Sequence, residues 1–366
     1  MNVKNLRLIN FRNYYNLNVE FNDNINIFMG KNAQGKTNLI EALYICSYGK
    51  SFRTTKDREL INFNKEQAYI GANTKLNNLE KFIEVKMERD KPKRIRINKS
   101  ELKNYKELNT GLVSVLFCPD DLKMIKEGPL LRRNFLDASI SQIKPVYSYN
   151  LIRYNKVLMQ RNNLLKTCRI KKDLVNLIDV FDIQLSKLGT SIIIERDKFI
   201  NELNILINPI HKNLTCDKES VELKYFSNIP RLIDKESIEK EYLKLLKSNL
   251  NRDIEYGTTE IGLHRDDLLM LINNKDVKIY GSQGQQRTLV LSIKLSVVEY
   301  IKKYFGVYPV VLLDDVFSEL DEDRRKFLSN SFKNMQVFIT VTDAVDLNAV
   351  NDLSKSVFII EDGKVI

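Results

Sequence analysis

One stretch of eight residues has the residue types and the spacing needed to hold phosphate groups. It fits the pattern G-x-x-x-x-G-K-[ST], with glycines at 30 and 35. Glycine allows backbone angles that a Cβ forbids, so successive N–H groups can converge on phosphate oxygens. Lys36 places a positive charge near the β- and γ-phosphates, and the Thr37 hydroxyl can ligate Mg²⁺. The residues predicted to line a nucleotide are Gly30, Lys31, Asn32, Ala33, Gln34, Gly35, Lys36, Thr37 and Asn38.

The segments on either side of this loop support the interpretation. Asn24 to Met29 alternates like a β-strand, and Asn38 to Tyr48 has apolar residues at helical spacing. A strand, a glycine loop and a helix N-terminus together form an anion-binding site. The alternative is a chance match in an ordinary turn, which the flanking pattern disfavours.

A second cluster of residues could hold the metal and activate water. Val310 to Leu313 is a run of four apolar residues that ends in Asp314 and Asp315, the Walker B pattern. A buried strand would deliver Asp314 to Mg²⁺, and Asp315 could orient and deprotonate a water molecule. Many buried strands end in Asp, so the pattern gains weight from its neighbours. These are Ser318-Glu319-Leu320-Asp321, and Ser282-Gln283-Gly284-Gln285-Gln286 at the start of a long helical segment.

The composition narrows the class of protein. The 366 residues carry a net charge of +11, and no apolar run is long enough for a membrane span. The first residues lack the apolar core of a signal peptide. The four cysteines are far apart and form no Cys-x-x-Cys pair, which argues against zinc and against disulfides. We therefore expect a cytoplasmic protein with no membrane partner. The positive net charge suggests that its binding partner is a polyanion.

Basic residues are concentrated between 132 and 172. This segment has ten lysines and arginines and one acidic residue. Tyr147, Tyr149 and Tyr154 lie among them, and aromatic rings can stack on unpaired bases while cations follow the phosphates. The alternative is a solvated helix face. The predicted DNA contacts are Arg132, Arg133, Arg153, Lys156, Arg161 and Lys166.

The periodicity predicts an α/β chain with a helical insertion. We expect an N-terminal part over 1–119, a mainly helical part over 120–250, and a return to α/β texture over 251–366. The first part should contain a hairpin over 3–21 and three antiparallel strands over 68–98. A further hairpin is predicted from 267–272 and 277–280, around Asn273-Asn274.

Taken in order, the motifs resemble those of the ABC and SMC ATPases. Ser282 to Gln285 is similar to the Ser-Gly-Gly-Gln signature of that group, with Gln283 in place of the first glycine, and Ser318 to Asp321 is similar to its D-loop. The resemblance implies that Ser282, Gly284 and Gln285 of one subunit cap the γ-phosphate held by another. ATP would then join two heads in an ATP-dependent homodimer.

Longer strings resemble the RecF family of bacterial DNA replication and repair proteins. They are Asn10-Phe11-Arg12-Asn13-Tyr14, Ser51-Phe52-Arg53-Thr54, Phe117-Cys118-Pro119-Asp120-Asp121-Leu122, Arg132-Arg133-Asn134-Phe135-Leu136-Asp137, His264-Arg265-Asp266-Asp267-Leu268 and Ser282-Gln283-Gly284-Gln285-Gln286-Arg287-Thr288. The resemblance implies an ABC-type (SMC-like) P-loop ATPase head with a mixed sheet and an inserted α-helical arm. It also implies binding of single-stranded and gapped double-stranded DNA, help in loading recombinase with RecO- and RecR-type mediators, and support of the SOS response. By likeness to SMC heads, Arg12 lies near the γ-phosphate.

Three departures from the group's pattern affect the expected chemistry. Asp315 stands where most ABC ATPases have Glu, and a side chain shorter by one methylene suggests slow turnover. The resemblance to the RecF family implies a weak, DNA-dependent ATPase that uses hydrolysis as a switch. No histidine lies near Val341, so Thr340 or Thr342 would contact the γ-phosphate instead. No glutamine follows the strand ending at Cys118, where Asp120 stands in its place.

Other functions remain open from the sequence. An ABC transporter motor would not need the basic segment. An SMC-type tether would need a longer insertion for its coiled coil. A DNA-binding or scaffold module with a vestigial P-loop, or another SMC-like ATPase, fits most of the same residues. ATP-dependent dimerisation would separate a DNA-repair switch from the vestigial module.

Overall fold

The computed structural model describes residues 1–366 except 77–78, 103–104, 171, 318–319 and 343–353. The chain forms two compact units. The first contains residues 1–122, 210–218 and 288–366, and the second contains 123–209 and 219–287. The first predicted boundary, at 119/120, lies three residues from the observed one. The second boundary lies at 287/288 and not at 250/251, because the segment 251–287 packs with the helical unit.

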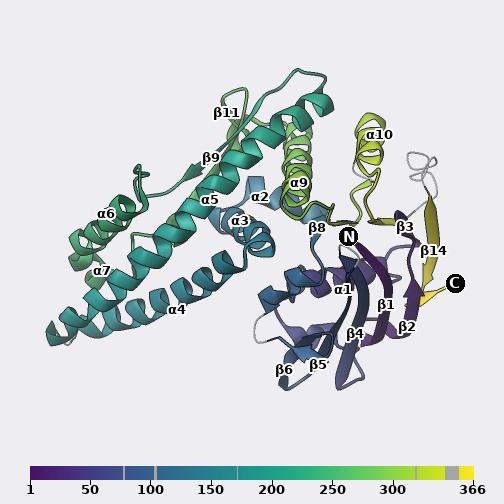
Figure 1. Ribbon diagram of the computed structural model, residues 1–366, viewed down its shortest axis with the longest axis horizontal. Helices are drawn as coiled ribbons and strands as arrows, with labels where there is room; N and C mark the ends of the chain where they lie inside the picture. Colours follow the sequence, from purple (N-terminus) through teal and green to yellow (C-terminus); the bar gives the residue numbers. More distant parts are fainter. Residues whose placement is uncertain (77–78, 103–104, 171, 318–319, 343–353) are drawn as a thin grey trace. The chain divides into compact units, whose positions relative to one another are not determined.

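An antiparallel sheet makes up one layer of the first unit (Figure 1). Its strand order is β2-β1-β4-β5-β6-β7, and all its pairings are antiparallel. The strands are β1 (Asn2–Phe11), β2 (Tyr14–Glu20), β4 (Gln67–Leu76), β5 (Leu79–Glu88), β6 (Lys91–Ile97) and β7 (Ser100–Glu101). The predicted hairpin over 3–21 and the three strands over 68–98 are confirmed.

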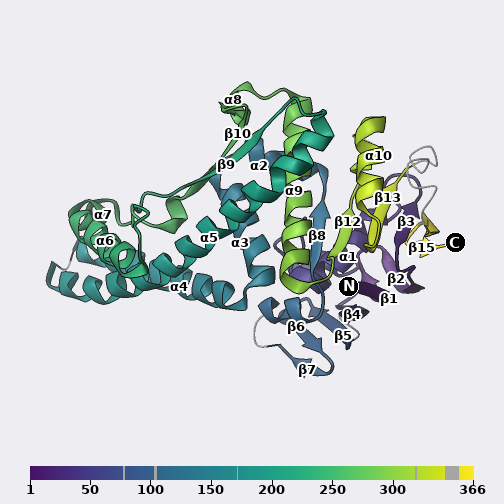
Figure 2. The same cartoon turned by 45° about the horizontal axis from the view of Figure 1, so that its top comes forward.

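A second sheet of the same unit is parallel except at one edge. Its strand order is β15-β14-β3-β13-β12-β8, and only β15 runs antiparallel to its neighbour. Figure 2 shows β8, β12, β13 and β3 side by side. The strands are β3 (Ile25–Met29), β8 (Ser114–Phe117), β12 (Val310–Leu313), β13 (Val337–Val341), β14 (Lys355–Glu361) and β15 (Lys364–Val365). Parallel strands end at a common edge, so the loops after β3 and β12 share one side of the sheet.

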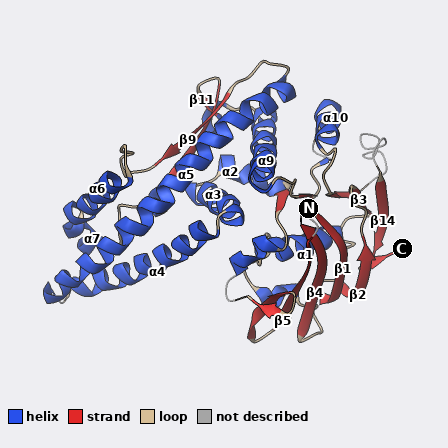
Figure 3. Cartoon of the chain, in the orientation of Figure 1, coloured by secondary structure: helices blue, strands red, loops and turns tan. Residues whose placement is uncertain are grey.

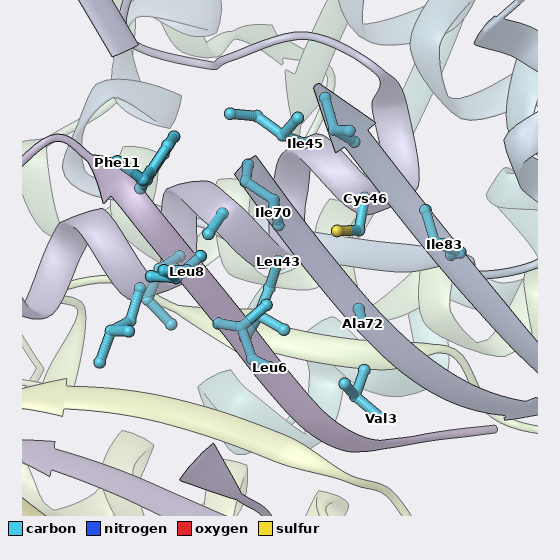
Figure 4. Close-up of a cluster of buried hydrophobic side chains, with 14 of the residues drawn as sticks. Val3, Leu6, Leu8, Phe11, Leu43, Ile45, Cys46, Ile70, Ala72 and Ile83 are labelled. Carbon is cyan, nitrogen blue, oxygen red and sulfur yellow. The ribbon is translucent and has the colours of Figure 1, made fainter. Parts of the chain in front are cut away.

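Helix α1 (Lys36–Tyr48) contributes side chains to the main apolar cluster of the first unit. Leu43, Ile45 and Cys46 meet side chains of β1 and β4, such as Leu6 and Ile70 (Figure 4). All five are inaccessible to solvent. Burial of each large aliphatic side chain contributes about 1.5–3 kcal/mol, so this cluster holds the P-loop helix firmly in place. The unit also contains α10 (Glu322–Ser331), η1 (Asp57–Leu60), η2 (Tyr105–Thr110) and η3 (Pro119–Leu122).

Helices dominate the second unit (Figure 3). They are α2 (Lys123–Lys126), α3 (Pro129–Ile143), α4 (Pro145–Cys168), α6 (Lys235–Ser248), α7 (Leu250–Tyr256) and α8 (Val277–Tyr280), with η4 (Lys172–Leu177) and η5 (Leu263–Arg265). Two long helices belong in part to each unit: α5 (Ile178–Thr215) and α9 (Gln283–Phe305). Among the residues that the structure describes, no helix is both long and apolar enough to cross a membrane.

A small antiparallel sheet completes the second unit, in the order β11 (Lys275–Asp276), β10 (Asp267–Ile272), β9 (Val221–Phe226). Two asparagines of α5 cover the free edge of β9. Asn208 donates to the carbonyl of Val221 and accepts from its N–H, and Asn204 does the same with Leu223. These bonds satisfy edge groups that would otherwise be open to pairing with another chain.

The predicted hairpin over 267–280 is only partly correct. Asn273 and Asn274 form the turn, and both have positive φ angles, as two-residue hairpin turns require. The second strand, however, contains only Lys275 and Asp276. Val277 to Tyr280 is a short helix, because the Asp276 side chain accepts a hydrogen bond from the N–H of Lys278 and starts a helical turn.

Candidate nucleotide-binding site

The P-loop connects β3 to α1 and is in close contact with its neighbours. At Gly35 φ is +119°, and an added Cβ would lie 2.7 Å from Asn13 Nδ2 and 3.0 Å from the Tyr14 hydroxyl. At Gly30 an added Cβ would lie 2.3 Å from the carbonyl oxygen of Ile360. The two glycines of the motif are therefore needed for both backbone conformation and space.

Lys36 lies in the first turn of α1 and is 8% exposed. Its ammonium donates to the carbonyls of Gly30, at 2.6 Å, and Lys31, at 2.9 Å. Burial lowers the pKa of this amine, and the carboxylates of Asp315 and Asp314 partly oppose that shift. The ammonium thus bonds to two backbone carbonyls of the loop, and phosphate oxygens could replace these partners.

The end of β12 lies beside the start of α1. The Thr37 hydroxyl donates to Asp314 Oδ1 at 2.8 Å, and the Thr340 hydroxyl donates to the same oxygen at 3.1 Å. Burial raises the pKa of Asp314, and the two hydroxyl hydrogen bonds oppose that shift. A hydroxyl and a buried carboxylate oxygen are the hard ligands that Mg²⁺ prefers. The donor set therefore fits this ion.

Asp315 is exposed and has φ +55°. Its N–H donates to the Thr340 hydroxyl at 2.8 Å. The Thr340 hydroxyl therefore forms hydrogen bonds with both acids. A contact of Thr340 or Thr342 with the γ-phosphate stays a prediction. Asp120 is exposed in η3. Its neighbour Asp121 accepts from the N–H of Cys118 and forms an ion pair with Lys294. These contacts give Asp121 a structural role.

Arg12 lies at the tip of the β1–β2 hairpin and forms a bidentate ion pair with Glu41. The two contacts measure 2.8 and 2.7 Å, and Glu41 is fully buried. The same carboxylate accepts from the Ser51 hydroxyl and lies 3.7 Å from Arg53. Arg53 also donates to the Asn38 side chain at 2.9 Å. Sequence reasoning missed Glu41 and Arg53 as site residues, although a single acid within the apolar run of α1 was a usable signal.

The signature residues lie at the N-terminus of α9. Ser282 and Gln285 form a reciprocal capping box: the Ser282 hydroxyl accepts from the N–H of Gln285, and the Gln285 side chain accepts from the N–H of Ser282. Gln285 also donates to Glu219 at 2.8 Å. Ser282 and Gly284 are exposed. All three predicted residues belong to the second unit, whereas the P-loop belongs to the first.

Ser318 and Glu319 of the predicted D-loop lie outside the described residues. The remaining two, Leu320 and Asp321, precede α10. The Asp321 side chain accepts from the N–H of Arg324 and caps that helix.

The structure corrects two of the six predicted DNA contacts. Arg161 is 0% exposed and bonds to Asp182 at 2.6 Å and Asp253 at 2.7 Å. Arg132 is 5% exposed and forms a bidentate pair with Asp267. A guanidinium enclosed by carboxylates inside the unit cannot reach a phosphate backbone, so the prediction is wrong for both.

The other four predicted contacts differ in exposure. Arg153, Lys156 and Lys166 are exposed on α4. Arg133 is half-buried and donates to the carbonyl of Asp266. Of the three tyrosines, Tyr147 and Tyr154 are buried, whereas Tyr149 is 56% exposed and lies under the Arg153 guanidinium, 5.5 Å from ring centroid to Cζ. The outer face of α4 thus keeps part of the predicted basic and aromatic surface.

The first unit defines a class of protein. A P-loop follows β3, and an acidic pair follows β12. In the parallel sheet β13 lies between these two strands, and the same unit contains a separate antiparallel sheet. This is the nucleotide-binding head of the ABC and SMC type, as the sequence predicted.

Comparisons with known proteins give the family. The model of the RecF/RecN/SMC N terminal domain matches residues 2–364. The DNA replication and repair protein RecF of Clostridium perfringens (strain SM101 / Type A) is 45% identical over 365 residues, which cover 100% of this chain and 99% of that protein. RecF of Clostridium beijerinckii is 44% identical over 366 residues, which cover 100% and 98%. The chain therefore belongs to the RecF family of the RecF/RecN/SMC group.

Solved structures agree with this assignment. The recombination mediator protein RecF-ATPrS in the RecFOR pathway has a TM-score of 0.92 and 35% identity, covering 100% of this chain and 97% of that one. The Smc head domain of Pyrococcus furiosus has a TM-score of 0.57 and 15% identity, covering 100% and 95%. The second likeness concerns the fold alone.

Proposed function

We propose that this chain is an ATP-dependent, DNA-binding switch in recombinational DNA repair and replication restart. ATP binding joins two copies on single-stranded or gapped double-stranded DNA, and slow hydrolysis releases them. The switch acts with RecR- and RecO-type mediators to help load recombinase, and it supports the SOS response. The observation that carries this proposal is the direct hydrogen bond between Thr37 and Asp314 beside the Lys36 ammonium. The names of the relatives agree with it.

The residues of the site have separate roles in this proposal. The N–H groups from Gly30 to Asn38 surround the phosphates, and Lys36 exchanges its two carbonyl partners for β- and γ-phosphate oxygens. Thr37 and Asp314 hold Mg²⁺, which neutralises charge on the phosphates when bound. Asp315, exposed beside them, orients the attacking water. Its side chain is one methylene shorter than Glu, which is consistent with slow turnover.

Two heads should share each ATP, with Ser282 of one subunit against the γ-phosphate held by the other. Ser282→Arg should leave ATP binding to the monomer nearly intact and block dimerisation, because a large charged side chain replaces a small exposed hydroxyl at a helix N-terminus. The measurement is sizing of the protein with ATP, with ADP, and with or without gapped DNA.

Mixing two variants tests the shared site directly. Neither Ser282→Arg nor Lys36→Ala protein alone should hydrolyse ATP. In a mixed dimer, Lys36 of the first chain meets Ser282 of the second, so one intact site forms and activity partly returns. Absence of recovery, in a mixture shown to contain mixed dimers, excludes the shared arrangement. Dimers that form without ATP would favour a DNA-binding module with a vestigial nucleotide site.

DNA binding should be tolerant of sequence and strongly dependent on salt, because phosphate contacts dominate it. Replacing Arg153, Lys156 and Lys166 together by Ala should lower the log–log salt slope by about 2, since each single-strand phosphate contact contributes about 0.7. Fluorescence anisotropy with a labelled single strand measures the slope. A matched control removes three exposed lysines of α6, Lys235, Lys240 and Lys244. An equal change in both triple variants would mean that net charge, and not the α4 surface, controls binding.

A further inference from the structure

The last β-hairpin of the chain lies directly against the P-loop. Strand β14 pairs in parallel with β3, with Ile359 opposite Met29. The turn that follows β14 therefore emerges at the same edge of the sheet as the P-loop. This turn, Glu361–Lys364, makes two backbone contacts with one P-loop residue: the N–H of Asp362 donates to the Gln34 side chain at 2.7 Å, and the N–H of Gly363 donates to the Gln34 carbonyl at 3.1 Å.

A second turn reaches the same carbonyl. Asn13, at the tip of the β1–β2 hairpin, donates through Nδ2 to the Gln34 carbonyl at 2.8 Å and accepts through Oδ1 from Asn38 at 2.8 Å. The carbonyl of Gln34 thus accepts hydrogen bonds from two turns that are distant in the sequence. All of these residues belong to the first unit.

Planarity of the peptide bond gives this arrangement a consequence for the nucleotide. In a trans peptide the C=O of one residue and the N–H of the next point in opposite directions. Two donors that fix the direction of the Gln34 oxygen therefore also fix the direction of the Gly35 N–H, which lies on the opposite side of the same peptide. Gly35 has φ +119° and no side chain of its own to restrict that peptide. Without the two donors, the peptide between residues 34 and 35 would be free to rotate.

We propose that the C-terminal turn Glu361–Lys364 is a positioning element of the nucleotide site, which acts with Asn13 to orient the Gly35 N–H toward the phosphates. The inference rests on the proposed binding of ATP at the P-loop. No residue of the turn needs to touch ATP for this effect. Its removal should therefore weaken ATP binding and leave the rate at saturating ATP nearly unchanged.

Gly363 is the position at which the idea can be tested most sharply. It has φ +71°, and an added Cβ would lie 2.3 Å from the Asn13 carbonyl oxygen and 2.9 Å from its carbonyl carbon. Both atoms are backbone, so they cannot move aside without shifting the hairpin tip. A shift of Asn13 disturbs its bond to Gln34. Gly363→Ala should therefore displace both donors of the Gln34 carbonyl at once.

The chain offers a matched control at Gly306. This glycine, in the same unit, has φ +73°, but an added Cβ would meet no atom within 4 Å. Gly306→Ala and Gly363→Ala therefore impose the same backbone strain, and only the second disturbs the P-loop. Asn13→Ala is an additional variant, which removes one donor to the Gln34 carbonyl together with the acceptor of the Asn38 side chain, and it adds no backbone strain.

The experiment measures equilibrium binding of Mg–ATP by calorimetry, steady-state hydrolysis, and unfolding by urea for the full-length protein. We expect Gly363→Ala to bind ATP about tenfold more weakly than Gly306→Ala, the equivalent of one or two disturbed hydrogen bonds. Asn13→Ala should show a smaller loss, and kcat should stay within about twofold for both, since neither residue touches the reacting atoms. If Gly363→Ala does not fold, the affinity of Asn13→Ala decides.

The possible outcomes separate the two proposals. If wild-type and Gly306→Ala proteins bind ATP and both test variants bind it as tightly, the positioning role is wrong and the proposed function stands. If the wild-type protein itself binds no ATP, the proposed function fails first. Equal losses of affinity at Gly306 and Gly363 would also overturn the inference, because they would trace the effect to backbone strain.

Discussion

Lys36→Ala protein is expected to bind Mg–ATP roughly a hundredfold more weakly than wild type, or not measurably. The Lys36 side chain is buried, and its ammonium donates to the carbonyls of Gly30 and Lys31. Charge-assisted hydrogen bonds to phosphate contribute about 1.5–3 kcal/mol each. Loss of two such bonds accounts for the expected size. Calorimetric titration with Mg–ATP measures it.

Lys31→Ala is the matched control for this prediction. Lys31 lies five residues earlier in the same loop, but its side chain is exposed and only its carbonyl contacts Lys36. Its replacement should change ATP affinity by less than about threefold, as expected for a solvated surface charge. Normal ATP binding by Lys36→Ala would show that the loop is not the nucleotide site. Equal losses in both variants would mean that the net charge of the loop matters more than the position of the amine.

Arg161→Ala is expected to destabilise the helical unit by about 3–5 kcal/mol, as is typical when one partner of a buried ion pair is removed. Arg161, Asp182 and Asp253 are all inaccessible to solvent. The guanidinium joins α4, α5 and α7 through these two carboxylates, and it also donates to the Thr259 hydroxyl. Without it, both buried carboxylates lose the guanidinium that pairs with them. Urea unfolding followed by far-ultraviolet circular dichroism measures the change.

Arg153→Ala, on the same helix, is expected to change DNA binding more than stability, the opposite of Arg161→Ala. Arg153 is exposed and its guanidinium lies over the Tyr149 ring. Its removal should cost at most about 1 kcal/mol of stability, the size of an exposed cation–π contact, and should weaken DNA binding. Arg161→Ala should show the reverse pattern under conditions where it is folded. A strong loss of stability at position 153, or none at 161, would contradict the burial of these two side chains.

The local part of the nucleotide site could be predicted from the sequence. A strand, a glycine loop and a helix lie consecutively in the chain, so the spacing from Gly30 to Thr37 was enough to place Lys36 at a helix start. The predicted strand from Val310 to Leu313 and the acids after it are likewise local features. The structure adds that Thr37 and Asp314, 277 residues apart, share a hydrogen bond. That contact follows from parallel strands that end at one edge of the sheet, and it agrees with the prediction that both residues hold Mg²⁺.

Tertiary packing decided what local pattern could not. Arg153 and Arg161 are both arginines of α4. Arg153 is solvated and Arg161 is buried because different elements of the fold pack around the two positions. The second domain boundary moved to 287/288 because the segment 251–287 supplies β10 and Asp253 to the helical unit. Val277 to Tyr280 alternates like a strand, but a local cap from Asp276 made it a helix.

The contacts around Gln34 show most clearly which features of the site depend on the local sequence and which depend on the tertiary structure. The sequence by itself determined that a phosphate-binding loop exists, because its glycines and lysine act through their own backbone and charge. It did not determine what holds that loop in shape. Asn13 lies 21 residues before Gln34, and Asp362 lies 328 residues after it. No spacing rule joins such positions, since they meet only when two sheets have brought their turns to one edge of the fold.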